Sequence, residues 1–73
     1  MHLEYFSDTD TLYIQLKEGS AAETLEVAQD VVLDLNETGS VIGIELEHAT
    51  DHVDLDSFRV TSLPVTTVES KAG

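Results

Sequence analysis

The chain has 73 residues, which is enough for one small domain, and it contains no cysteine. Disulfides and thiolate metal sites are therefore excluded, and a reducing cytoplasm is the expected location. The formal net charge is −12, with 15 Asp and Glu against 3 Lys and Arg, so no basic stripe exists for nucleic acid or an anionic membrane. No apolar run is long enough to suggest a transmembrane helix or a signal peptide.

The excess of acidic residues has three interpretations. It fits halophilic adaptation to a very salty cytosol, where screening lengths shrink to about 3 Å and repulsion fades. It also fits a surface that meets a basic protein partner. A metal site is the third interpretation. The first two are compatible with each other.

Short runs with alternating apolar residues fill the first half of the chain. Residues 1–6 and 12–16 are predicted strands, separated by a polar turn at residues 7–11 whose side chains can bond their own backbone. A loop at residues 17–22 leads to a short third strand at residues 23–27.

A hairpin at residues 30–50 is the centre of the predicted fold. Its strands, 31–35 and 41–46, are rich in Val, Ile and Leu at period two. A four-residue loop at 36–39 would oppose Leu33 to Ile42 and Val31 to Ile44. Gly39 would then take a positive φ, which glycine tolerates.

The pattern weakens after residue 46. We expect a short helical turn near residues 50–57, an extended stretch at 58–63 and, after Pro64, at most an edge strand. The predicted fold is mainly β, of a β-rich α+β class: a single small antiparallel β-meander of about five strands. One domain would cover residues 1–68, with a disordered tail at 69–73.

Periodicity divides the strand residues between two faces. The predicted core face is apolar and consists of Leu3, Tyr5, Leu12, Ile14, Leu16, Val31, Leu33, Leu35, Ile42, Ile44 and Leu46. The outer face would carry a patch of Tyr13, Val32, Val41 and Gly43, rimmed by Gln15, Asp34 and Glu45. Either residues 53–63 or a second chain, such as another copy in a homodimer, would cover this patch. The predicted interaction residues are Tyr13, Val32, Val41, Asp34 and Glu45.

Few side chains suggest chemistry. His48 and His52, with Asp51 between them, could hold a metal ion if they lay on one helix, and a solvated surface is the competing interpretation. Asp8 and Asp10 resemble the start of a calcium loop, but the glycine and the distal glutamate of such a loop are missing. No nucleophile has a base at a suggestive spacing, so we expect no catalytic residues, no cofactor and no enzymatic activity.

Three segments carry a family resemblance. YFSDTDTLYIQL at residues 5–16, the short Glu-rich stretch at residues 23–27 and VVLDLNETGSVIGIELEHAT at residues 31–50 resemble the domain-of-unknown-function family numbered 2283, and the likeness covers residues 3–50. Asp10, the Leu12-Tyr13-Ile14 run with Leu16, Gly39, the Gly43-Ile44-Glu45 run and Ala49 match its pattern. Phe6 and Thr50 stand where the family usually has aspartate and serine.

The resemblance implies a small protein without established activity, often one half of a gene pair whose other half resembles a toxin-like ribonuclease. We therefore expect a non-enzymatic interaction protein, antitoxin-like, that binds a small basic ribonuclease-like partner. The alternative is a small ligand- or metal-binding module, and a weak hydrolase is the third class that the sequence leaves open.

The net charge yields a prediction about salt. Because charge −12 on so small a chain repels itself, the melting temperature should climb steeply from low salt to molar potassium chloride. Thermal unfolding followed by circular dichroism measures this. A flat response would contradict the salt-adaptation interpretation.

Overall fold

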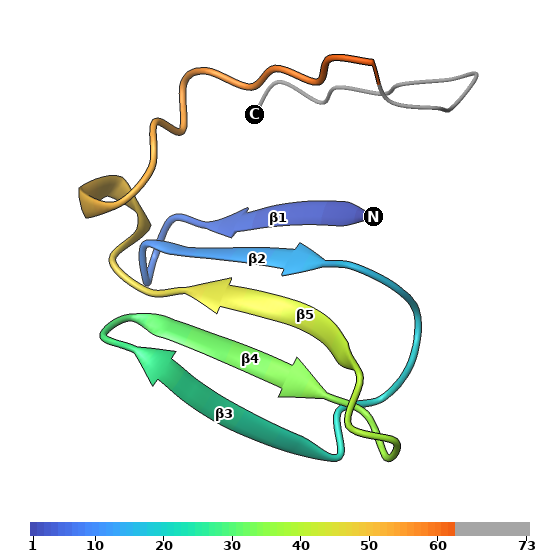
Figure 1. The fold of residues 1–73 in the computed structure, drawn as a ribbon. Coiled ribbons are helices and arrows are strands. Elements are labelled where there is room, and N and C mark those ends of the chain that lie inside the picture. The colour runs from blue at the N-terminus through green and yellow to red at the C-terminus, as the bar shows by residue number, and fades with distance from the viewer. Residues whose placement is uncertain (63–73) are drawn as a thin grey trace.

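A computed structural model describes residues 1–62 and contains one five-stranded antiparallel sheet (Figure 1). A single 3₁₀ turn, η1 (Ala49–Asp51), follows the last strand. The strands are β1 (His2–Phe6), β2 (Thr11–Gln15), β3 (Glu23–Ala28), β4 (Val31–Leu35) and β5 (Val41–Leu46). The mainly β class and the strand positions predicted from the sequence are confirmed. Within residues 1–62, no helix has the length and apolar character that crossing a membrane requires.

The strand order is β1-β2-β5-β4-β3, so the sheet is not a sequential meander. The last strand, β5, lies in the centre between β2 and β4, while β3 lies at the edge (Figure 1). The composition of the two strands explains why β5 is central and β3 lies at the edge. VIGIEL has one charged residue among six, whereas ETLEVA has two glutamates, and charged side chains suit an edge strand that must not pair with another chain.

The β4–β5 loop is one residue longer than predicted and comprises residues 36–40. Leu33 pairs with Ile44, and Val31 pairs with Leu46, so the predicted pairs were displaced by two residues. A bulge-like irregularity follows: Asp34 pairs with Gly43 and Leu35 with Val41, so one further residue of β5 is skipped. The total shift is therefore two residues, and the apolar side chains of both strands stay on the same face. Gly39 has φ 82°, as predicted. The loop is fixed by the Asn36 side chain, whose Oδ1 accepts hydrogen bonds from the backbone N–H of Thr38 and of Ser40, each at 3.0 Å.

Directly paired residues project from the same face, so the register defines rows across the sheet. One row contributes an aliphatic residue from every strand: Leu3, Ile14, Ile44, Leu33 and Leu25. The next row on that face contains Tyr5, Leu12, Leu46, Val31 and Ala28. We call these ten residues the apolar face. At its corner, Glu23 pairs with Leu35.

The apolar face is not a buried core. Among the hydrophobic residues at positions 1–62, only Ile42 (3% exposed) and Ala49 (0%) are buried. Leu3, Tyr5 and Leu25 at the sheet edges remain 40%, 41% and 51% exposed. Within residues 1–62 the sheet is a single layer, and its apolar side is partly open to solvent.

The segment after η1 does not supply the second layer within residues 53–62. It leaves the sheet and lies beyond the β1 edge, not across a face (Figure 1), and Leu55, Phe58 and Val60 are exposed. The helical turn predicted over residues 50–57 is limited to Ala49–Asp51, and residues 58–62 form no strand. The interpretation that this segment covers the sheet is therefore wrong for residues 53–62. The predicted positions of Leu63 and Pro64 and the tail at 69–73 lie outside the described residues.

Burial predicts where truncation is most harmful. Ile42→Ala should lower the free energy of unfolding by about 2–5 kcal/mol, because Ile42 is the one large aliphatic side chain of residues 1–62 that the sheet and its loops bury. Val32→Ala, on the half-exposed opposite face, should lower it clearly less. Urea unfolding of both variants measures the difference, and equal losses would contradict this burial.

Candidate functional site

The face opposite the apolar one is acidic. Its central row contains Glu4, Tyr13, Glu45, Val32 and Glu26, one from each strand in spatial order. The glutamates therefore occupy alternate strands, roughly 9.6 Å apart at a strand spacing of about 4.8 Å. The neighbouring row contains His2, Gln15, Gly43, Asp34 and Thr24. We call these two rows the acidic face. It unites four of the five predicted interaction residues: Tyr13, Val32, Asp34 and Glu45.

Tyr13 organises this face by lying across the central strand. From β2, its hydroxyl reaches over β5 and donates a 2.9 Å hydrogen bond to Asp34 Oδ2 on β4. The ring occupies the space beside Gly43, where an added Cβ would lie only 2.7 Å from Tyr13 Cζ. Desolvation, followed by the Asp34 contact, raises the pKa of Tyr13, so the phenol stays protonated. Gly43 is thus a site of close approach by an aromatic ring, which covers the bare backbone.

One predicted interaction residue does not lie where the sequence placed it. Val41, predicted as an interaction residue beside Tyr13 and Val32, instead pairs with Leu35 at the strand irregularity, in register with the apolar side. Glu23 also pairs with Leu35 and is separated from the central row of the acidic face. The extra loop residue explains the change at Val41, because it shifts the alternation at the start of β5.

A cluster of polar contacts holds the end of β5. Asp10, at the end of the β1–β2 turn, has φ 54° and binds the segment after β5 through both backbone and side chain. Its carbonyl accepts a 2.8 Å bond from Ala49 N–H, and its carboxylate accepts bonds from the Tyr5 hydroxyl and the Thr50 hydroxyl, each at 2.7 Å. The β1–β2 turn is therefore hydrogen-bonded to η1.

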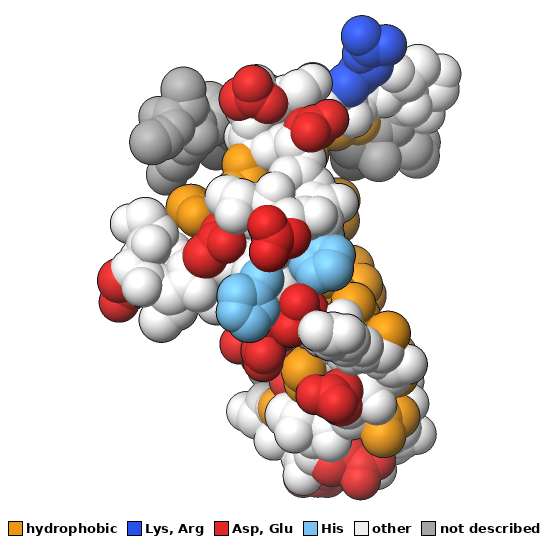
Figure 2. Space-filling model, turned by 90° about the vertical axis from the view of Figure 1, so that its left-hand side faces the viewer, with side chains coloured by type: hydrophobic (Ala, Val, Ile, Leu, Met, Phe, Trp, Pro, Cys, Tyr) orange, Lys and Arg blue, Asp and Glu red, His pale blue; other side chains and the backbone are white. Residues whose placement is uncertain are grey.

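Asp30 repeats this arrangement from the other hairpin. At the end of the β3–β4 turn it has φ 66°, and its carbonyl accepts a 2.8 Å bond from Glu47 N–H. One carboxylate oxygen lies 3.1 Å from His48 Nδ1 and the other 3.0 Å from His52 Nε2. The Asp30 side chain is only 15% exposed, whereas that of His48 is 67% exposed. Two imidazoles and acidic side chains are visible together at this end of the sheet (Figure 2).

The pKa shifts of this cluster follow from these contacts. Hydrogen bonds from His52 and then His48 lower the pKa of Asp30, and the bond to Asp30 raises the pKa of His48. Hydrogen bonds from Thr50 and then Tyr5 lower the pKa of Asp10. Both aspartates are therefore held as anions that anchor the end of β5.

His48 and His52, the predicted metal ligands, both contact Asp30. His48 and His52 meet at Asp30, not at Asp51, and His48 precedes η1 in a left-handed conformation with φ 51°. They do not share one helix face as the metal interpretation required. Among residues 1–62, no group of three or more His, Cys, Asp or Glu side chains is placed to hold a metal ion. Asp10 is engaged by Tyr5 and Thr50, so the pair with Asp8 is no calcium loop.

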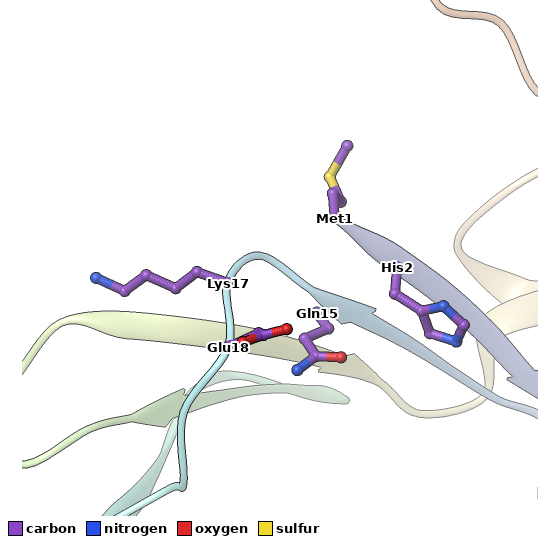
Figure 3. A pocket seen from close by; sticks show the side chains of 5 residues that line it. All are labelled: Met1, His2, Gln15, Lys17 and Glu18. Carbon is purple, nitrogen blue, oxygen red and sulfur yellow. The ribbon is translucent and has the colours of Figure 1, made fainter. Parts of the chain in front are cut away.

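The hollows in the surface are open and lack convergent polar groups. One of about 220 Å³ is lined by Met1, His2, Gln15, Lys17 and Glu18, and the Lys17 side chain points away from the others (Figure 3). Enclosed ligand pockets usually span about 300–1,000 Å³ and bring polar groups together. A second hollow, at Ser20 and residues 36–38, has about 390 Å³ but is more open than the first. The first hollow borders the acidic face through His2 and Gln15. Neither hollow contains a residue of the central row of that face, which we call the acidic row, or of the aspartate–histidine cluster formed by Asp30, His48 and His52.

A family model described as a protein of unknown function, DUF2283, matches residues 2–49. The chain belongs to this family. The match ends at Ala49, so it covers the complete sheet and the buried alanine that Asp10 contacts. No curated protein and no solved structure matches the chain.

In this DUF2283 domain, sequence reasoning missed the partners of Asp10 and Asp30. One signal was present: each aspartate is the last residue of a turn, directly before a strand, where a left-handed residue often ends a hairpin loop. Aspartate tolerates that conformation better than most residues. The contacts with Thr50 and with His48 and His52 span 18 to 40 residues, and no local pattern encodes them.

The ring of Tyr13 over Gly43 yields a mutational cycle. Gly43→Ala should destabilise the domain by about 1–3 kcal/mol, because the new methyl group displaces the ring. In a Tyr13→Ala background the same change should be nearly neutral, giving a coupling energy on the order of 1 kcal/mol or more. Urea unfolding of the four proteins tests this, and simple additivity would contradict it.

The aspartate–histidine cluster predicts a pH window. Because the pKa of His48 is raised in the folded state, its contribution to the free energy of unfolding is complete below about pH 6.5. This contribution is lost as the pH rises through the pKa of the folded state. Because the pKa of Asp30 is lowered in the folded state, its contribution to the free energy of unfolding is complete above about pH 4. This contribution is lost as the pH falls through the pKa of the folded state.

The melting temperature of wild type should therefore exceed that of His48→Asn most between about pH 4 and 6.5 and converge towards it at higher pH. Asparagine is chosen because it tolerates the positive φ of this position. His2→Asn serves as the control, since His2 lies at the β1 edge, 3.7 Å from Glu4. A difference that is constant across the pH range would contradict the assignment.

Proposed function

We propose that this DUF2283 chain is a non-enzymatic interaction protein whose acidic face binds a small basic protein, in the manner of an antitoxin that covers the RNA-binding cleft of a ribonuclease-like toxin. The supporting observation is the row of Glu4, Glu45 and Glu26 across all five strands. A rigid sheet places these charges at fixed separations, which a count of acidic residues alone would not provide.

The spacing suits a broad basic surface. Three carboxylates on alternate strands extend over roughly 19 Å, with Asp34 in the neighbouring row. Lys and Arg side chains that normally meet RNA phosphates could pair with such an array, and this attraction would speed association and make it sensitive to salt.

Apolar surface lies between the charges. Tyr13 and Val32 separate the three glutamates in the row, and the Tyr13 hydroxyl is already committed to Asp34. Tyr13 therefore offers a partner its ring. Such contacts would keep some affinity at high salt, where charge pairs are screened.

Support for a non-enzymatic role comes from the engaged polar groups. The Tyr5 and Tyr13 hydroxyls each donate to an aspartate. The bond to Asp10 raises the pKa of Tyr5, and desolvation followed by the bond to Asp34 raises the pKa of Tyr13, which disfavours either phenol as a base. Ser20 and Thr38 line one of the hollows beside Glu37, but the Thr38 hydroxyl donates to Asn36, and in the described part of the chain neither hydroxyl is hydrogen-bonded to a carboxylate or an imidazole.

The test compares two variants of equal charge. Glu4→Gln/Glu26→Gln/Glu45→Gln removes the acidic row, and Glu18→Gln/Glu37→Gln/Glu47→Gln removes the same number of charges from loops and the end of β5. A basic protein is captured from host extract at the native salt concentration, purified, and its association is measured with each variant together with its ribonuclease activity.

The row variant should lose most of the binding and of the ribonuclease inhibition, and the loop variant should keep both. Equal losses would show that only net charge matters and would contradict a placed acidic face. Recovery of no basic partner would also reject the proposal and favour the alternative of a small ligand-binding module.

A further inference from the structure

The apolar face has no covering layer within residues 1–62. It presents aliphatic side chains from every strand, with Leu3 and Leu25 at its two edges still 40% and 51% exposed. Hydrophobic side chains gather along one side of the sheet when it is viewed on edge (Figure 2). Globular domains bury such a face against a second layer, and monomers seldom expose a large one.

The amount of exposed surface is large for this mass. The chain exposes 5809 Å², whereas a compact monomer of 8.0 kDa exposes about 4,450 Å². Part of the excess of roughly 1,400 Å² belongs to the segment that runs off the sheet, and part to the open face. A standard interface removes about 800 Å² per partner, so an open face that supplied somewhat more than half of this excess would suffice for a dimer contact.

The distribution of charge indicates which molecule would cover the apolar face. In the two rows that make up the apolar face no charged residue occurs, and the adjoining pair Glu23 and Leu35 adds one carboxylate at a corner. The carboxylates of Glu4, Glu26, Asp34 and Glu45 project from the opposite face. A basic partner would be attracted to that opposite face, whereas an uncharged aliphatic face complements another of its kind.

We propose that two copies of this chain pack their apolar faces together as a β-sandwich dimer with both acidic faces outward. Two such sheets would lie about 10 Å apart, with the rows around Ile44 and Leu33 forming the shared core. The acidic charges would then lie on the outside of the dimer, where they repel each other least. Each dimer would offer two acidic faces.

Salt separates this proposal from the binding of a basic partner. Each copy has a formal charge of −12, so screening should strengthen the dimer, while it weakens an interaction between opposite charges. The two proposals use opposite faces and respond to salt in opposite directions. Either can therefore fail while the other stands.

Sedimentation equilibrium of the full chain at low and molar potassium chloride tests the dimer, with Leu3→Gln/Leu25→Gln as the interface variant. The matched control, His2→Gln/Thr24→Gln, changes the same two edge strands on the opposite face. Wild type and control should be dimeric and should associate more tightly at high salt. The interface variant should weaken association at least tenfold and keep the circular dichroism of the sheet.

A wild type that is monomeric at both salt concentrations would overturn the proposal. So would an interface variant that dimerises like wild type, or a control that dissociates equally. If the interface variant fails to fold, the melting temperature of wild type decides: a dimer melts higher as its concentration rises, and a temperature independent of concentration overturns the proposal.

Discussion

A sheet one layer thick has to cover its apolar side, and this constraint governs the architecture of the domain. The five strands supply a continuous aliphatic row from Leu3 to Leu25, yet only Ile42 and Ala49 are buried among the hydrophobic residues of positions 1–62. Burial of apolar area is the main favourable term in folding. A domain of this size whose apolar face has no covering layer within residues 1–62 gains less from burial than a two-layer domain does. Further burial by association would therefore add directly to its stability.

What the chain does achieve alone is a fixed sheet. Two hairpins flank β5, and each ends its turn on a left-handed aspartate whose carbonyl and carboxylate bind the residues just after β5. Asp10 holds Ala49 and Thr50, while Asp30 holds Glu47, His48 and His52. These contacts connect the edges of the sheet to its centre, and Tyr13 adds a third connection across Gly43 to Asp34. The acidic row is rigid because the strands beneath it are joined in this way.

The strands were predictable from the sequence because period-two alternation is a local property. The positive φ of Gly39 was also predictable, because the loop between β4 and β5 needs such a residue and glycine tolerates it. The central position of β5 was not, since strand order depends on contacts between residues far apart in the chain. The fate of Val41 depended on one extra loop residue, which the alternation pattern alone does not reveal. His48 and His52 were recognised as a pair, but their common partner, Asp30, is 18 and 22 residues away. The acidic face was largely foreseen, because Tyr13, Val32, Asp34 and Glu45 follow from alternation once the pairing is antiparallel.

The central claim is that a second copy covers the apolar face, and isotope-filtered NMR tests it most directly. A sample mixed from ¹³C-labelled and unlabelled chains at molar potassium chloride reports only contacts between copies. Intermolecular signals should connect methyl groups of Ile14, Leu33 and Ile44, which lie in the middle row of the apolar face. The absence of intermolecular signals, or signals confined to Val32 on the acidic face, would contradict the claim.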